Sequence, residues 1–118
     1  MTDLVDLIIY KQYLELIFYT ENICVKYPKS ERYSLTNNIK NTTYEGMKSI
    51  IKAQKERDKK VRLTILNNID TELKMIKVYI RISYKRKFIT VKNYCAWSKK
   101  ITNISNMLGG WINSCVRQ

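Results

Sequence analysis

Apolar residues recur at spacings of three and four along most of the chain, which is the repeat of one helix face. The clearest run steps regularly through Leu66, Ile69, Leu73, Ile76, Ile80 and Ser83. A second run keeps the same heptad spacing through Tyr94, Trp97, Ile101, Ile104, Leu108 and Trp111. Its phase is unbroken across Gly109-Gly110, so we expect one continuous helix there. A helix that ends at Gly109 is the alternative.

The first predicted helix differs because it carries two apolar stripes. One stripe contains Leu7, Tyr10, Leu14, Ile17 and Cys24, and the second contains Ile9, Tyr13, Leu16, Ile23 and Tyr27. A helix on the surface of a bundle needs only one apolar side. We therefore expect the second stripe to contact another copy of the chain, and a helix buried centrally in one chain is the alternative.

The boundaries of the helices follow from local start and stop signals. Pro28 limits the first helix, because the residue before a proline avoids the helical conformation. Ser30, Asp58 and Thr90 are suitable N-caps for the three later helices. The predicted helices span residues 4–26, 30–54, 58–86 and 91–114.

The helix over 30–54 has a less regular apolar side. Its apolar positions are Leu35, Ile39, Thr43, Met47, Ile50 and Ile51. Gly46 lies in its middle, where glycine costs about 1 kcal/mol relative to alanine. Close contact with another helix would explain this glycine, and a local irregularity is an equally good explanation.

Four long helices joined by short connections predict an all-α fold. Short connections make successive helices antiparallel, so we expect an up-down-up-down four-helix bundle. The length of 118 residues predicts a single domain over residues 1–118. The chain contains three glycines and one proline, too few for the many turns of a β-sandwich. A three-helix DNA-binding domain is disfavoured, because these helices are too long for one.

The charge of the chain points to a polyanionic partner. Twenty-two Lys and Arg residues oppose ten Asp and Glu residues, a net charge of +12. The charge is uneven, since residues 73–118 contain ten basic residues and no acidic one. A domain with this charge attracts nucleic acid first. The other interpretation is a small soluble protein that is simply basic.

The strongest basic pattern follows the helix over 58–86. Lys74, Lys77, Arg81 and Lys85 step along one face, which can follow a phosphate backbone. Tyr79 lies beside them and, with Tyr84, can stack on unpaired bases. The alternative is a solvated helix face with partly packed tyrosines. The candidate nucleic-acid-binding residues are Lys74, Lys77, Arg81, Lys85, Arg86, Lys87, Lys92, Lys99 and Lys100.

Catalytic and metal-binding chemistry find little support in the sequence. Histidine, the commonest general base and zinc ligand, is absent. The three cysteines lie far apart without a CxxC pair, and no Gly-rich phosphate loop is present. We therefore expect no enzyme activity, no metal and no cofactor. We expect reduced, mostly buried thiols in a cytoplasmic protein. Neither a signal peptide nor a membrane span is recognisable, since Lys11, Glu15 and Glu21 interrupt the most apolar stretch.

Two segments carry a resemblance to a known family. Tyr27-Pro-Lys-Ser-Glu-Arg-Tyr33 resembles an aromatic-Pro-x-x-Glu-x-aromatic segment that joins the first two helices of a bacterial four-helix-bundle family. Asn106-Met-Leu-Gly-Gly-Trp-Ile112 resembles the segment that closes its fourth helix. The family comprises accessory variability determinant (Avd) proteins of diversity-generating retroelements and proteins encoded in intervening sequences of 23S ribosomal RNA genes. The resemblance covers nearly the whole chain.

The resemblance implies a function. Avd proteins form homopentameric barrels, bind nucleic acid through a basic surface and associate with the retroelement reverse transcriptase to support mutagenic cDNA synthesis. We therefore expect a homo-oligomer, by resemblance a pentamer, that binds a reverse transcriptase together with RNA or cDNA. The first alternative is an interaction protein of the intervening-sequence type without a retroelement role. The second is a general basic RNA-binding module without a fixed protein partner.

Overall fold

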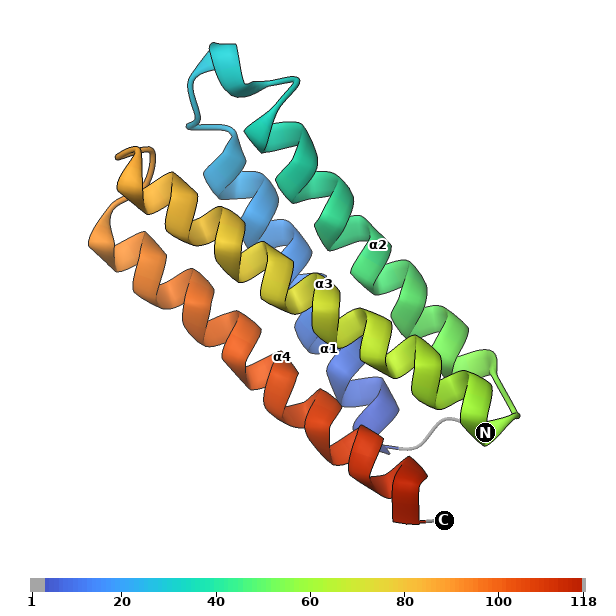
Figure 1. Cartoon of the computed structure of the whole chain (residues 1–118). Coiled ribbons are helices and arrows are strands. Elements are labelled where there is room, and N and C mark those ends of the chain that lie inside the picture. The colour runs from blue at the N-terminus through green and yellow to red at the C-terminus, as the bar shows by residue number, and fades with distance from the viewer. Residues whose placement is uncertain (1–3, 118) are drawn as a thin grey trace.

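Four antiparallel helices form the bundle in a computed structural model, which describes the backbone of residues 4–117 and the side chains of residues 8–117 (Figure 1). The elements are α1 (Leu4–Cys24), a short 3-10 helix η1 (Lys29–Glu31), α2 (Leu35–Lys55), α3 (Lys59–Lys85) and α4 (Val91–Arg117). Each helix packs on two others, because α1 and α3 both contact α2 and α4. The predicted all-α, up-down-up-down bundle is confirmed.

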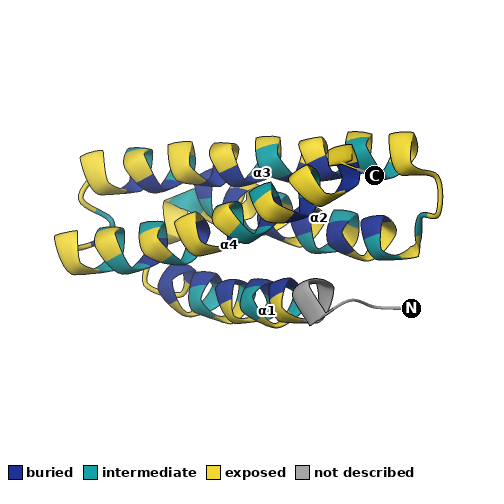
Figure 2. Ribbon diagram, turned by 90° about the horizontal axis from the view of Figure 1, so that it is seen from below, coloured by how far each residue is buried: buried dark blue, intermediate teal, exposed yellow. Residues whose placement is uncertain are grey.

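The core lies along the axis of the bundle, where the buried residues of all four helices meet (Figure 2). All six heptad positions predicted between Leu66 and Ser83 are buried. On α4 the positions from Trp97 to Trp111 are buried as well, while Tyr94 is half-buried. The spacing of three and four therefore identified the inward side of both long helices.

The inward side of α1 is the stripe that we expected at a subunit contact. Ile9, Tyr13, Leu16, Ile23 and Tyr27 are all buried within this chain, and α1 packs on α2 and α4. They lie in the chain's own core instead of on a surface open to a second copy. Both stripes of α1 have helical spacing, so spacing alone did not distinguish the inward one.

The other apolar stripe of α1 remains only partly covered. Tyr10, Leu14 and Ile17 are half-buried, whereas Cys24 at its end is buried. Leu7, its first position, lies outside the residues whose side chains are described. The outward side of α1 therefore keeps apolar surface in the single chain.

The start of α2 differs from the prediction. The helix begins at Leu35 and not at Ser30, which belongs to the preceding turn of 3-10 helix. The hydroxyl of Ser34 donates to Oε1 of Glu31 at 3.0 Å and holds the chain in this turn. The buried Leu35 is then the first core residue of α2. Ile51, which we expected on the inward side, is 42% exposed, because the core positions run through Gly46, Ile50 and Ala53.

Close contact explains the glycine in the middle of α2. A Cβ atom at Gly46 would overlap with the hydroxyl of Tyr13. This hydroxyl donates to the carbonyl oxygen of Thr43 at 2.7 Å, inside the core. Gly46 therefore gives Tyr13 the space to satisfy its buried hydroxyl, as polar groups in a core require.

The N-caps at Asp58 and Thr90 act as predicted, whereas α1 ends at Cys24 instead of residue 26 and α4 extends beyond residue 114. The carboxylate of Asp58 accepts hydrogen bonds from the N–H groups of Lys60 and Val61, at 2.9 and 3.1 Å, and caps α3. The hydroxyl of Thr90 accepts from the N–H of Asn93 at 3.1 Å and caps α4. The helix α4 continues through Gly109-Gly110 to Arg117.

Candidate nucleic-acid interface

The C-terminus of α3 presents a concentrated group of basic residues. The helix ends where Lys87 adopts the left-handed backbone conformation, with a φ of 62°. The N–H of Lys87 donates to the carbonyl of Tyr84 at 3.0 Å, and that of Phe88 donates to Ser83 at 2.9 Å. This is the Schellman pattern, which usually has glycine at the left-handed position. A lysine there carries backbone strain but places another cation at the turn.

Three predicted cations and one predicted tyrosine surround an open hollow at this end of α3. Arg81, Tyr84, Lys85, Lys87 and Ile89 line the hollow, whose volume is about 590 Å³. Tyr84 is 43% exposed, and its ring centroid lies 4.9 Å from that of Tyr94 on α4. An exposed aromatic ring between cationic side chains fits a nucleotide, because the ring can stack on a base while the cations bind phosphate.

The basic face predicted on α3, here called the ridge, consists of Lys74, Lys77, Arg81 and Lys85, and its N-terminal half is less free to bind a ligand. Nζ of Lys74 lies 2.5 Å from the carboxylate of Asp70, one turn earlier on the same helix. Nζ of Lys77 donates to the hydroxyl of Thr102 on α4 at 3.0 Å. Both side chains are exposed, but each already has a polar partner. The part of the ridge without a described polar partner is therefore Arg81 and Lys85, which take part in neither described ion pair.

The basic residues of α4 divide between two sides of the helix. Lys92 and Lys99 are exposed and seven residues apart, so they share one side. Because Lys77 lies beside Thr102, the antiparallel register brings Lys99 to about the level of Arg81. Nζ of Lys100, in contrast, lies 5.1 Å from the centre of the Tyr19 ring on α1 and turns away from α3. Of the three predicted basic residues on α4, Lys92 and Lys99 therefore lie on the side of α3, and Lys100 lies on the side of α1.

Comparison with known families gives the context for this surface. The profile of the bAvd-like family matches residues 7–115, almost the whole described chain. The chain belongs to the bAvd-like family. This confirms the resemblance inferred from the Tyr27–Tyr33 and Asn106–Ile112 segments. Membership implies an accessory role in a diversity-generating retroelement, since proteins of this bacterial Avd-like family are generally non-catalytic accessory proteins. No curated protein matches the chain.

Other sequence expectations can be compared with the described residues of this bAvd-like chain. Cys24 and Cys115 are buried free thiols, whereas Cys95 is exposed. No helix in the described part of the chain combines the length and the apolar character needed to cross a membrane. Between residues 8 and 117, no cluster of three acidic or cysteine side chains is placed to hold a metal ion.

A second group of cations lies at the same end of the bundle, and the sequence interpretation did not select it. Lys29, Arg32 and Lys40 line a pocket between the end of α1 and the start of α2. Glu31, in the same corner, lies 4.0 Å from the guanidinium of Arg86 and links the two corners. The sequence signal for this group was the Tyr27–Tyr33 segment, which contains Lys29 and Arg32 but not Lys40.

Proposed function

We propose that this chain is an oligomeric accessory subunit of a diversity-generating retroelement, which binds the reverse transcriptase and its template RNA or cDNA. The observation that carries the proposal is the unneutralised basic surface around Arg81 and Lys85 on a chain of the bAvd-like family. Such a surface binds nucleic acid through phosphate contacts, without base-specific recognition. The subunit thus holds the strand while the enzyme carries out the synthesis.

The outward side of α1 supports self-association. Phe18 is 56% exposed, and Ile8 is 37% exposed on the same helix. The half-buried Leu14 and Ile17 lie beside them. Exposed apolar surface along a helix is typical of an interface. This side of α1 is the one that the core leaves free, so we propose that it forms the contact between copies, in a homo-oligomer that by family resemblance is a pentamer.

The match to the bAvd-like family also favours the retroelement role over the intervening-sequence type. Both the retroelement proteins and the intervening-sequence proteins share the fold, so the bundle alone does not distinguish them. The description of the matching family is that of the Avd branch. We therefore propose the retroelement role ahead of an interaction protein of the intervening-sequence type.

One experiment tests the proposal as a whole. The chain is co-expressed with a tagged reverse transcriptase from the same retroelement, and the retained complex is analysed by native mass spectrometry. We expect co-purification, more than one copy of the chain, and RNA binding whose logarithmic salt slope is about −0.7 per phosphate contact on a single strand. Phe18→Glu should release monomers that keep their helical circular dichroism.

The control for Phe18→Glu is Tyr33→Glu, which introduces the same charge at an aromatic residue that is 86% exposed outside α1. It should leave the oligomer intact. A wild-type monomer that neither retains the reverse transcriptase nor binds RNA at low salt would contradict the proposal.

A further inference from the structure

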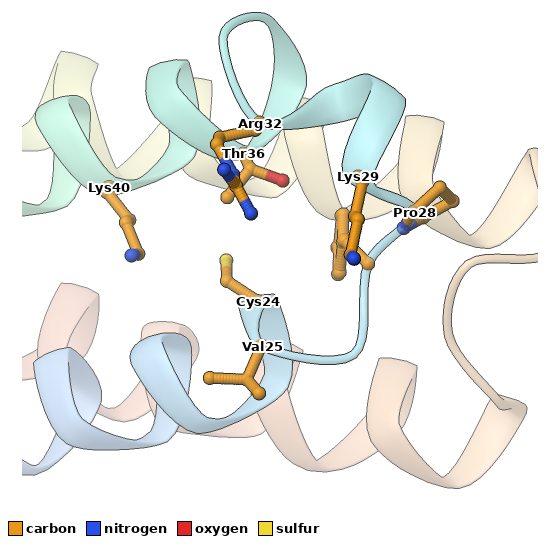
Figure 3. A pocket seen from close by; sticks show the side chains of 8 residues that line it. Cys24, Val25, Pro28, Lys29, Arg32, Thr36 and Lys40 are labelled. Carbon is orange, nitrogen blue, oxygen red and sulfur yellow. The ribbon is translucent and has the colours of Figure 1, made fainter.

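A pocket lies at the corner where the chain passes from α1 into α2. Its volume is about 310 Å³. The residues that line it are Cys24, Val25, Tyr27, Pro28, Lys29, Arg32, Thr36 and Lys40. Arg32 extends toward the thiol of Cys24, and the side chains of Lys29 and Lys40 lie to either side of this space (Figure 3). We call this site the corner pocket.

The cations of the corner pocket lack carboxylate partners. Among the described side chains, ion pairs join Lys74 to Asp70 and Arg86 to Glu31, and neither pair includes a residue of the pocket. The neighbouring carboxylate of Glu21 lies outside the lining and accepts a hydrogen bond from Tyr44 at 2.5 Å. Three like charges around one small space repel each other. A bound anion with more than one negative charge would remove this repulsion.

The uncharged groups of the corner pocket also suit an oxyanion. The hydroxyl oxygen of Thr36 is inaccessible to solvent and has no hydrogen-bond partner among the described residues. Buried polar atoms are normally satisfied, so this hydroxyl has a donor to spare, and it can reach a ligand once the side chain rotates toward the pocket. Burial raises the pKa of the Cys24 thiol to about 11, so the floor of the pocket is neutral at pH 7.

We propose that the corner pocket binds a phosphate group between its three cationic side chains. The guanidinium of Arg32 can donate two parallel hydrogen bonds to phosphate oxygens, and the lysines neutralise the remaining charge. After rotation of its side chain toward the pocket, the hydroxyl of Thr36 donates to another oxygen. A carboxylate has a single charge and two oxygens, and it would leave part of this donor set unused. The proposal goes beyond the function proposed above, because the site is separate from α3 and requires no reverse transcriptase.

Inorganic phosphate is the first probe. It is titrated into the ¹⁵N-labelled chain against chloride at equal ionic strength, and amide shifts are followed by NMR. We expect the shifts to concentrate in residues 24–40 and to spare the α2–α3 connection. The double variant Arg32→Gln/Lys40→Gln should weaken phosphate binding about tenfold or more. The matched control Lys48→Gln/Lys52→Gln removes the same charge from exposed positions of α2 and should retain the affinity.

A second variant separates binding from folding. Thr36→Val keeps the shape of the side chain but removes the hydroxyl, and it should weaken phosphate binding about fivefold. Thr36→Ser restores a donor and should recover most of the affinity. Unchanged phosphate affinity in both the double variant and Thr36→Val, or shifts that lie away from the corner, would overturn the proposal.

RNA oligonucleotides identify the source of the phosphate. If a 5′-phosphorylated RNA binds more tightly than its 5′-hydroxyl counterpart only when the corner pocket is intact, the ligand is the end of a strand. If the double variant weakens both RNAs equally, the ligand is a backbone phosphate. If only inorganic phosphate responds, the ligand is a free or small phosphorylated molecule. Arg81→Gln/Lys85→Gln should leave inorganic phosphate binding unchanged, so failure of the α3 surface and failure of the corner pocket can be distinguished.

Discussion

The two ends of the bundle both carry basic residues but use them differently. At the turn end, formed by the connection between α2 and α3, the lysines that line a hollow share it with the acid Glu56, and other polar groups stabilise the turn itself. Asp58 caps α3, and the guanidinium of Arg62 donates to the backbone carbonyl of Glu56. At the corner end, formed by η1 and the α3–α4 connection, cations such as Arg32 and Arg81 line open pockets.

This difference shows that basic composition alone does not locate a binding surface. In a mixed-charge segment such as residues 55–60, each basic residue has an acidic residue within two positions along the chain. Residues 73–118 have no acids of their own, and the two ion pairs described there use Asp70 and Glu31, which lie outside this segment. Positive charge is therefore least compensated where a segment has no acids of its own and the neighbouring elements supply few.

Charge reversal at each end gives the largest expected contrast. Arg81→Glu/Lys85→Glu should weaken RNA binding about a hundredfold at low salt, because it removes phosphate contacts and adds repulsion. Lys59→Glu/Lys60→Glu makes the same change in charge at the turn end, and it should cause a much smaller loss. Fluorescence anisotropy with a labelled RNA over a salt series measures both. Equal losses at the two ends would show that net charge, not the corner end, determines binding.

Loss of the cap at the turn end should have an intermediate effect, which lowers stability and not RNA affinity. Asp58→Ala should lower the free energy of unfolding by about 1 kcal/mol, because two N–H groups in the first turn of α3 lose their acceptor. RNA affinity should not fall, since the carboxylate contributes no binding charge. Urea denaturation and the same anisotropy assay test this, with Asp58→Asn as the conservative control. Weaker RNA binding by Asp58→Ala would mean that the two ends are coupled.

Sequence periodicity predicted the parts of the molecule that depend on one helix at a time. The heptad of α3 and the caps at Asp58 and Thr90 follow from local spacing and local hydrogen bonding. The inward side of α1 did not follow, because both of its stripes have helical spacing and only packing on α2 and α4 selects one. The convergence of Lys29, Arg32 and Lys40 arises from the path of the chain between two helices, which spacing along one helix does not describe.

The polar partners of the ridge residues could not be predicted from sequence spacing along one helix either, with one exception. The pair of Asp70 and Lys74 has the four-residue spacing of helical ion pairs, so the sequence contained the signal. The hydrogen bond from Lys77 to Thr102 depends on the register between α3 and α4. This register is fixed by how the buried side chains of α3 and α4 pack together, and the pattern of charges along the sequence does not reveal it.

The substitution with the smallest expected effect tests whether a residue at the corner end lowers the stability of the fold while it strengthens RNA binding. Lys87 has a φ of 62°, which glycine adopts without steric cost. Lys87→Gly should therefore raise the free energy of unfolding by up to about 1 kcal/mol. The same change removes a cation from the hollow beside Arg81, so RNA should bind several times more weakly, by about one phosphate contact. Lys87→Asn separates the two effects, since asparagine tolerates the left-handed conformation but carries no charge. If both variants bind RNA as tightly as the wild type, the strained lysine serves only the turn, and the corner end binds nucleic acid without it.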